Sequence, residues 1–220
     1  MQIYKINTSE MQTNTYIVVN GERAFVVDPG GDAKKIKDIL DGAGAKLDAI
    51  LLTHAHFDHI GGVAELTSVP DSDSRIADDE NSDKKNSVTV FLHRADADKI
   101  SSYKNMGFAV GAKVEPFVPD VLLAGGETLS VAGLKIKVIH TPGHTKGGVC
   151  YVVDDTLFSG DTVFKTSYGR TDFYDGSFNE IKNSIVNKLF NLKGDYKILP
   201  GHGEATSLDF ERMNNMILTD

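Results

Sequence analysis

Histidines are concentrated in one short segment of the chain. Leu51 to Gly62 reads LLTHAHFDHIGG and contains three of the seven histidines together with an aspartate. His54 and His56 are two positions apart, so in extended backbone they face the same way, whereas Asp58 and His59 follow a turn. Imidazole nitrogens and carboxylate oxygens are common ligands of transition metals. The segment therefore indicates a metal site.

Further metal-competent side chains follow strand-like runs elsewhere in the sequence. LKIKVIH leads through TPG to His144, TLFSG leads to Asp161, and YKILPG leads to His202, just as LDAILL leads to His54. Open α/β sheets bind their ligands beyond the carboxyl ends of the strands, because the loops that leave the strands converge there. We therefore expect these side chains to meet at one edge of a sheet.

The candidate ligands comprise five imidazoles and two carboxylates: His54, His56, Asp58, His59, His144, Asp161 and His202. A catalytic zinc ion usually has about three protein ligands and keeps one position open for water. Seven donors therefore suit two ions that share one carboxylate. Any one of these histidines, taken alone, could be an ordinary surface or core residue, but their joint pattern favours a binuclear site.

Short apolar runs and helical patterns alternate along the chain and predict a mixed α/β fold in a single domain over residues 1–220. Strands are predicted at 1–6, 14–20, 23–28, 47–53, 87–92, 134–140, 149–155, 156–160 and 196–201. Helices are predicted near 32–43, 59–67, 95–103, 178–189 and 207–217. In the fourth helix, Phe178, Ile181, Ile185 and Leu189 recur at helical spacing, which is typical of core packing.

Composition excludes several classes of partner. A formal net charge of -8 argues against general binding to nucleic acid or anionic membranes. The amino terminus lacks the basic start and apolar run of a secretory signal, which favours a cytoplasmic protein. The single cysteine, Cys150, cannot form an internal disulfide, and its setting in GVCYVV predicts a core residue. Residues 70–87 are acidic and polar, which predicts a flexible surface loop, or alternatively a lid beside the site.

The candidate ligands occur in motifs that resemble those of the metallo-β-lactamase-fold hydrolases. The matching stretches are Thr53 to His59, Pro142 to His144, Ser159 to Asp161 and Pro200 to Gly203. The resemblance is closest to the glyoxalase II-like (hydroxyacylglutathione hydrolase-like) branch, because of GDTVF at 160–164 and GRTD at 169–172.

This resemblance implies a four-layer αββα sandwich with two divalent metal ions at one edge. By motif position, His54, His56 and His144 would hold the first ion and Asp58, His59 and His202 the second, with Asp161 bridging them. Zinc is the usual metal in this family, and iron and manganese occupy related sites.

The resemblance also implies a hydrolase that acts on a small-molecule thioester or ester. Two ions roughly 3.5 to 4 Å apart lower the pKa of a shared water, so that hydroxide attacks the carbonyl near neutral pH. His54, His56, Asp58 and Asp161 would form the catalytic core, with Asp58 also orienting the hydroxide. Thioester cleavage is favoured because a thiolate leaves without prior protonation, and no additional general acid is evident in the sequence.

Arg170 and Tyr174 follow the bridging aspartate, where glyoxalase II-like enzymes contact the glutathione portion of their substrate. Arg170 would serve as a carboxylate clamp, or alternatively as the partner of Asp172 in an ion pair. Longer family members carry an additional carboxyl-terminal helical segment that completes the glutathione pocket. This chain ends shortly after His202, which leaves glutathione recognition open.

Other functions remain compatible with these motifs. A persulfide dioxygenase would use one iron held by two histidines and an aspartate, and a lactone or ester hydrolase would use the same scaffold. A non-catalytic metal-binding scaffold is a further alternative. β-Lactam cleavage is disfavoured, because the enzymes that perform it generally lack an aspartate at the position of Asp161. His93 and His140 are interpreted as structural residues outside the site.

Overall fold

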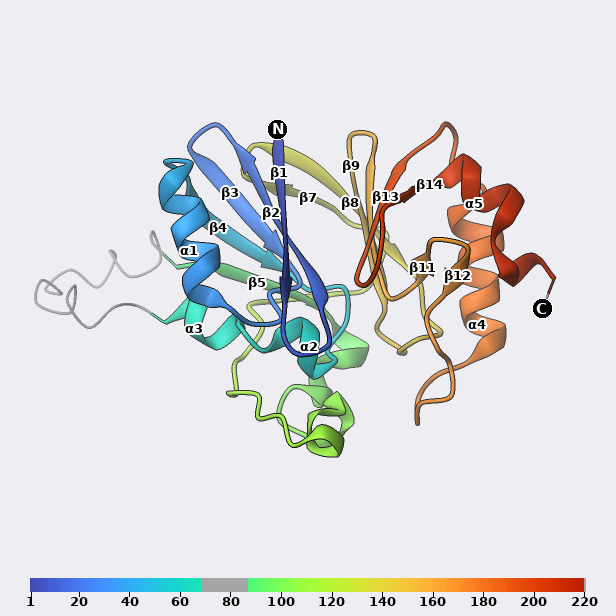
Figure 1. Ribbon diagram of the computed structural model, residues 1–220, viewed down its shortest axis with the longest axis horizontal. Helices are drawn as coiled ribbons and strands as arrows, with labels where there is room; N and C mark the ends of the chain where they lie inside the picture. The colour runs from blue at the N-terminus through green and yellow to red at the C-terminus, as the bar shows by residue number, and fades with distance from the viewer. Residues whose placement is uncertain (69–86, 220) are drawn as a thin grey trace, which may run out of the picture.

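The computed structural model describes residues 1–68 and 87–219 (Figure 1). The predicted acidic loop at 70–87 lies outside the described residues except for Ser87. Among the described residues, no helix is long and apolar enough to cross a membrane.

The first of two large sheets contains six strands in their order along the chain. Antiparallel pairing joins the first three strands, and parallel pairing joins the third to the sixth. These strands are β1 (Gln2–Thr8), β2 (Thr13–Asn20), β3 (Arg23–Val27), β4 (Lys46–Leu51), β5 (Thr89–His93) and β6 (Val121–Leu123).

The second sheet also has six strands, and all its pairings are antiparallel except that of β10 with β13. In spatial order its strands are β14 (Thr206–Ser207), β13 (Lys197–Pro200), β10 (Thr156–Gly160), β9 (Val149–Val153), β8 (Leu134–His140) and β7 (Thr128–Val131). A small separate hairpin consists of β11 (Val163–Phe164) and β12 (Ser167–Tyr168).

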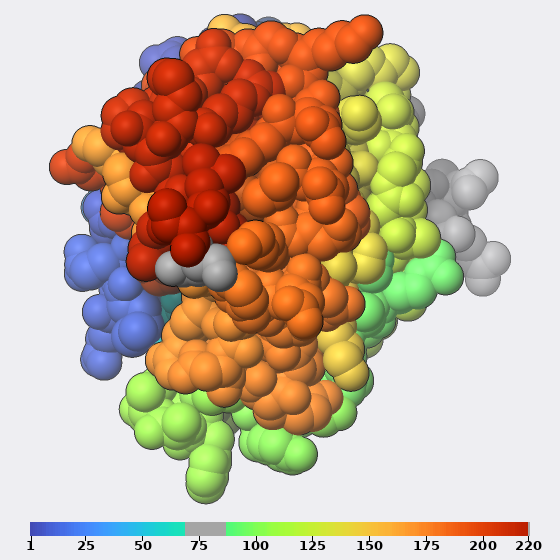
Figure 2. Space-filling view, turned by 90° about the vertical axis from the view of Figure 1, so that its right-hand side faces the viewer, coloured from blue at the N-terminus to red at the C-terminus, as the bar shows by residue number. Residues whose placement is uncertain are grey.

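Helices cover the outer face of each sheet. On the first sheet lie α1 (Ala33–Gly42) and α3 (Val63–Thr67). On the second lie α4 (Phe178–Lys182), its π-helical continuation η5 (Asn183–Leu189), α5 (Leu208–Asn214) and η6 (Met216–Leu218). Figure 1 shows the resulting order of helix, sheet, sheet and helix, and Figure 2 shows the helical layer over the second sheet. The predicted αββα sandwich is therefore confirmed.

Three apolar clusters hold these layers together. Between the two sheets, the ring of Phe158 meets Tyr16 at 5.4 Å and Phe25 at 6.4 Å between ring centroids. The predicted core stripe also packs as expected, because Ile181, Ile185 and Leu189 are fully buried against the second sheet. Burial of each such side chain contributes about 1.5–3 kcal/mol, so the two sheets form a rigid base for the loops at their edge.

Several predicted elements differ from those in the structure. The helix predicted near 59–67 is broken into α2 (Phe57–Ile60) and α3, because the glycines at 61 and 62 pass close to the backbone of residues 29–31. A Cβ atom on Gly61 would lie 2.6 Å from the carbonyl oxygen of Gly30. The segment predicted as helix near 95–103 instead forms short 3₁₀ turns, chiefly η2 (Arg94–Lys99) and η3 (Tyr103–Asn105), which is followed by η4 (Gly107–Val110).

Candidate metal centre

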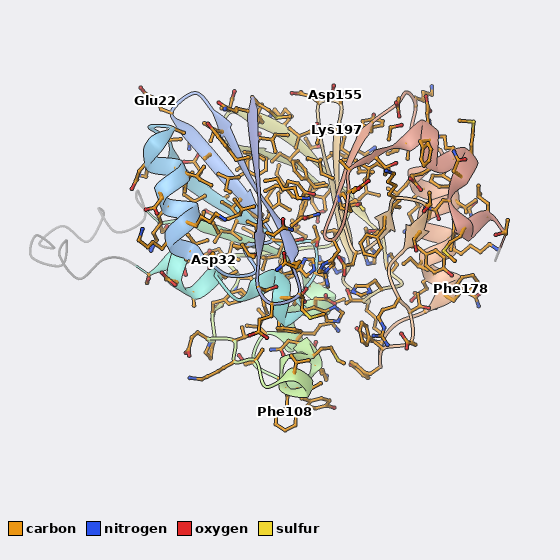
Figure 3. The ribbon with its side chains drawn as sticks, viewed as in Figure 1. Glu22, Asp32, Phe108, Asp155, Phe178 and Lys197 are labelled. Atoms are coloured by element: carbon orange, nitrogen blue, oxygen red, sulfur yellow. The ribbon has the colours of Figure 1, made fainter. Side chains whose placement is uncertain are left out.

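The predicted ligands converge at one edge of the sandwich. His54 and His56 follow β4, His144 follows β8, Asp161 follows β10 and His202 follows β13. Figure 3 shows Asp155 and Lys197, at the starts of β10 and β13, on the upper edge of the molecule, so both strands run down towards the opposite edge. Asp58 and His59 lie on α2 at that lower edge (Figure 1).

The first trio consists of His54, His56 and His144, and it is buried. Nδ1 of His56 lies 3.0 Å from Nε2 of His54 and 2.9 Å from Nε2 of His144. Three nitrogens this close can share an ion at about 2.0–2.1 Å. Nδ1 of His144 donates to the carbonyl oxygen of Arg170 at 2.8 Å, which leaves the lone pair on Nε2 directed into the trio.

The second trio consists of Asp58, His59 and His202. Oδ2 of Asp58 lies 3.2 Å from Nε2 of His202 and 3.5 Å from Nε2 of His59. The three ligand atoms lie close enough together to hold one ion.

Asp161 lies between the two trios. Its Oδ2 is 3.4 Å from Nε2 of His144 in the first trio and 3.6 Å from Nε2 of His202 in the second. Its Oδ1 is 3.4 Å from Nε2 of His59. One carboxylate thus reaches both groups, as a bridging ligand would.

Two atoms of this cluster have no hydrogen-bond partner. Among the described residues, Nε2 of His59 and Oδ1 of Asp161 are buried side-chain polar atoms without one. Leaving a buried polar atom unpaired costs about 1–3 kcal/mol. A cation between the nitrogen lone pair and the carboxylate oxygen would satisfy both atoms, so the residues fit a bound metal.

The electrostatics of the cluster also favour a cation. Burial, followed by repulsion from neighbouring histidines, lowers the pKa of His54 and His56, so both are neutral and able to ligate. Burial acts in the same direction on His59, but the carboxylates of Asp58, Asp161 and Asp28 outweigh it and raise its pKa to about 10. The second trio therefore attracts positive charge.

Asp28 holds two residues of the centre in place, Thr53 and His59, and it was not identified as a site residue from the sequence. Its carboxylate accepts hydrogen bonds from the backbone NH of Thr53 at 2.7 Å, from Oγ1 of Thr53 at 2.6 Å and from Nδ1 of His59 at 2.9 Å. The last bond fixes the tautomer of His59 and directs Nε2 at the site. The sequence offered a signal, because Asp28 directly follows the strand-like run RAFVV, just as the four recognised ligands follow strand-like runs.

Two glycines allow the ligand loops to approach one another. A Cβ atom on Gly201 would lie 2.2 Å from Oδ1 of Asp161 and 2.7 Å from Cε1 of His59. Gly160 has φ +48, and a Cβ there would lie 2.3 Å from Oγ1 of Thr53. A side chain at either position would displace a candidate ligand or its support.

The segment after Asp161 borders the first trio. The ring of Phe173 lies edge-on to His56 at 5.1 Å and to His144 at 5.7 Å, and the guanidinium of Arg170 lies over that ring at 4.3 Å. Arg170 also forms two 2.7 Å hydrogen bonds with Asp172, so the alternative ion pair is present. Tyr174 is 62% exposed.

The remaining candidates lie outside the two trios. His93 and His140 stack on each other with ring centroids 4.1 Å apart, and Nε2 of His140 bonds the carbonyl oxygen of Lys146. Cys150 is fully buried in the core beneath the second sheet's helices. These contacts agree with structural roles.

The chain belongs to the metallo-β-lactamase superfamily. The family described as "Metallo-beta-lactamase superfamily" matches residues 8–202. This membership, together with the clusters of histidine and aspartate, supports an enzyme that binds divalent metal ions.

Two curated relatives match the chain over nearly its whole length. "Probable metallo-hydrolase YqgX" from Bacillus subtilis is 31% identical over 222 residues, which cover 99% of this chain and 98% of the relative. "Hydroxyacylglutathione hydrolase GloC" from Haemophilus influenzae is 29% identical over 222 residues, with the same coverage of 99% and 98%.

Solved structures show the same architecture. BLEG-1 B3 metallo-beta-lactamase has a TM-score of 0.86 at 32% identity, covering 100% of both chains. TTHA1623 in a di-iron-bound form has a TM-score of 0.80 at 30% identity, covering 96% of this chain and 98% of the other. ETHE1 from Myxococcus xanthus has a TM-score of 0.76 at 23% identity, covering 98% of this chain and 83% of the other. At this identity the likeness supports the fold alone.

Proposed function

We propose that this protein is a binuclear metal-dependent hydrolase that cleaves thioesters, as in the glyoxalase II-like branch. The observation that carries the proposal is the position of Asp161, whose two oxygens face both the first and the second trio. A carboxylate that lies close to ligand atoms of both trios suits a ligand shared by two ions.

The residues of the two trios have different roles in the proposed reaction. Divalent ions held by the two trios would polarise a substrate carbonyl and lower the pKa of a water enough to make it nucleophilic near neutral pH. His54, His56 and His144 supply neutral nitrogens, while Asp58, His59 and His202 supply the more negative half of the site. Asp58 is held by a 2.7 Å hydrogen bond from Oγ1 of Thr13, so its carboxylate can orient the attacking water.

A thioester suits this centre because its leaving group needs no proton donor. A thiolate departs unprotonated far more readily than an amine, so thioester cleavage does not require a separate general acid beside the trios. The name of the Haemophilus relative, a hydroxyacylglutathione hydrolase, agrees with a thioester substrate. Arg170 and Tyr174 are the proposed contacts with the substrate, Arg170 by exchanging Asp172 for a substrate carboxylate.

The proposed metal is zinc, with iron as the alternative. Nitrogen and carboxylate ligands suit both metals. The similar structure of TTHA1623, which was solved in a di-iron-bound form, favours iron as the alternative to test.

β-Lactam hydrolysis is a second candidate function, because BLEG-1, named as a B3 metallo-beta-lactamase, is similar over the whole chain. Both reactions would use the same trios, so a substrate comparison separates them. A persulfide dioxygenase would instead bind one iron and consume oxygen.

The test is a substrate panel run on zinc-loaded and iron-loaded protein, with thioesters of hydroxy acids, lactones, β-lactams and a persulfide. Thioester turnover that is abolished in His56→Ala and retained in His93→Gln, a histidine outside both trios, is the expected result. Turnover of a β-lactam or oxygen consumption with a persulfide, without thioester cleavage, would refute the proposal.

A further inference from the structure

A buried aspartate outside the trios joins the loops that carry the first trio. Asp96 lies in η2, just after β5, and is fully buried. Its carboxylate accepts hydrogen bonds from the backbone NH of Ala55 at 3.1 Å, from Oγ1 of Thr145 at 2.9 Å and from the backbone NH of Gly147 at 2.8 Å. Three donors on one buried carboxylate fix the positions of all three groups.

These donors belong to the two loops of the first trio. Ala55 stands between His54 and His56, after a strand of the first sheet, and Thr145 directly follows His144, after a strand of the second sheet. Asp96 therefore connects loops that come from opposite halves of the sandwich. The fit is close, because a Cβ atom on Gly147 would lie 2.6 Å from Oδ1 of Asp96.

A buried lysine lies beside this carboxylate and connects it to the segment that contains Phe173. Burial raises the pKa of Asp96, and Lys99, whose side chain is 1% exposed, opposes that effect with its Nζ 3.6 Å from Oδ1. Lys99 also donates a short hydrogen bond to Asp175. Asp175 accepts from the backbone NH of Lys146 at 3.3 Å and belongs to the same segment as Phe173.

We propose that Asp96, held by Lys99 and Asp175, is a positioning residue that sets the spacing of His54, His56 and His144 and hence the affinity of the first metal position. This inference rests on the proposed function, because it assumes that the first trio binds an ion. Among the described residues, the supports of the second trio are different ones. Asp58 is held by Thr13, and the loop of His202 is held by Asn14, whose Nδ2 donates to Pro200 and Gly203.

This division predicts that loss of Asp96 weakens one metal position and spares the other. In Asp96→Asn the side chain keeps its size, but its NH₂ group must face the backbone NH of Gly147 or that of Ala55, so at least one hydrogen bond is replaced by two opposed donors. Changing a group that orients a metal ligand typically lowers metal affinity about 10–100-fold. General destabilisation of the protein would weaken both positions alike.

The experiment is a Co²⁺ titration of the full chain, followed by visible absorption and by competition with a chelator. Spectra of His56→Ala and His202→Ala assign the bands to the two positions. Asp96→Asn is expected to lose first-trio affinity about 10–100-fold and to keep second-trio affinity. The matched control is Asp98→Asn. Asp98 lies in the same 3₁₀ turn as Asp96 but is exposed and pairs with Lys104, so its replacement should change neither metal affinity. Unchanged affinities in Asp96→Asn, or equal weakening at both positions, would overturn the inference.

Thr145→Val is a milder second variant that keeps the test decisive if Asp96→Asn does not fold. It removes one hydrogen bond to Asp96 without burying a new polar group, so first-trio affinity alone should fall by up to about tenfold. No change, or an equal fall at both positions, would contradict the inference. The titration uses no substrate, so a protein that binds two ions but cleaves no thioester would refute the proposed function and leave the role of Asp96 standing.

Discussion

Replacing Asp28 with asparagine should weaken the second metal position and destabilise the protein. Three donors share the two oxygens of Asp28: the backbone NH of Thr53 on Oδ1, and Oγ1 of Thr53 together with Nδ1 of His59 on Oδ2. Asparagine has only one oxygen, so its NH₂ group must face one of these donors whichever way the amide is turned.

The less damaging orientation keeps the oxygen at the Oδ2 position and leaves the NH of Thr53 unpaired. A buried donor without a partner costs about 1–3 kcal/mol in the free energy of unfolding. The loss of charge behind His59 also weakens its hold on a metal ion by about 10–100-fold, which corresponds to about 1.4–2.8 kcal/mol of binding free energy.

The assay combines metal competition with a chelator and urea unfolding of the metal-free protein. The matched control is Asp32→Asn, four residues along the chain, where the carboxylate is exposed and caps no backbone group of α1. Asp28→Asn with wild-type metal affinity and wild-type stability would refute the supporting role of Asp28.

Three further predictions follow from the same geometry. Thr13→Val removes the 2.7 Å hydrogen bond to Asp58 and should lower the metal affinity of the second trio about 10–100-fold, while that of the first trio stays constant. An equal loss of affinity at both positions in the Co²⁺ titration would contradict this prediction. Gly201→Ala should abolish binuclear metal binding in elemental analysis, since the new Cβ would lie 2.2 Å from Oδ1 of Asp161. The control Gly42→Ala, at a position in α1 with open space around it, should bind metal normally and gain up to about 1 kcal/mol of stability. Normal metal content in Gly201→Ala would contradict the prediction. In metal-free protein the pKa of His59 is raised from 6.5 to about 10, so its stabilising effect is complete below about pH 6.5 and is lost as pH rises towards 10. Urea unfolding should therefore show a fall in stability over that window that His59→Gln removes, and an equal fall in the variant would argue against this origin.

The ligands could be predicted from the sequence because each follows a recognisable strand. The runs before His54, His144, Asp161 and His202 have strand-like composition, and all four strands form. Strand ends at one edge of a sandwich bring distant residues together without any signal from local spacing. The same pattern at RAFVVD pointed to Asp28, which lies outside the motif stretches that carry the family resemblance.

The supports of the ligands could not be predicted in this way. Asp96 meets Ala55 across 41 residues and Thr13 meets Asp58 across 45 residues, and neither lies in a motif. Their roles depend on which loops the two sheets bring into contact, which is a property of tertiary packing. Strands β6, β7 and β14 were missed for a different reason, since runs of two to four residues are too short for periodicity to detect.

The most direct test of the central claim is a crystal structure of the protein grown with its purified metal complement, with anomalous scattering used to locate and identify the ions. We predict two transition-metal ions per chain, one bound by His54, His56 and His144 and one bound by Asp58, His59 and His202, with Asp161 bound to both. A single ion, or ions elsewhere with both trios vacant in metal-replete crystals, would contradict the binuclear hydrolase described above.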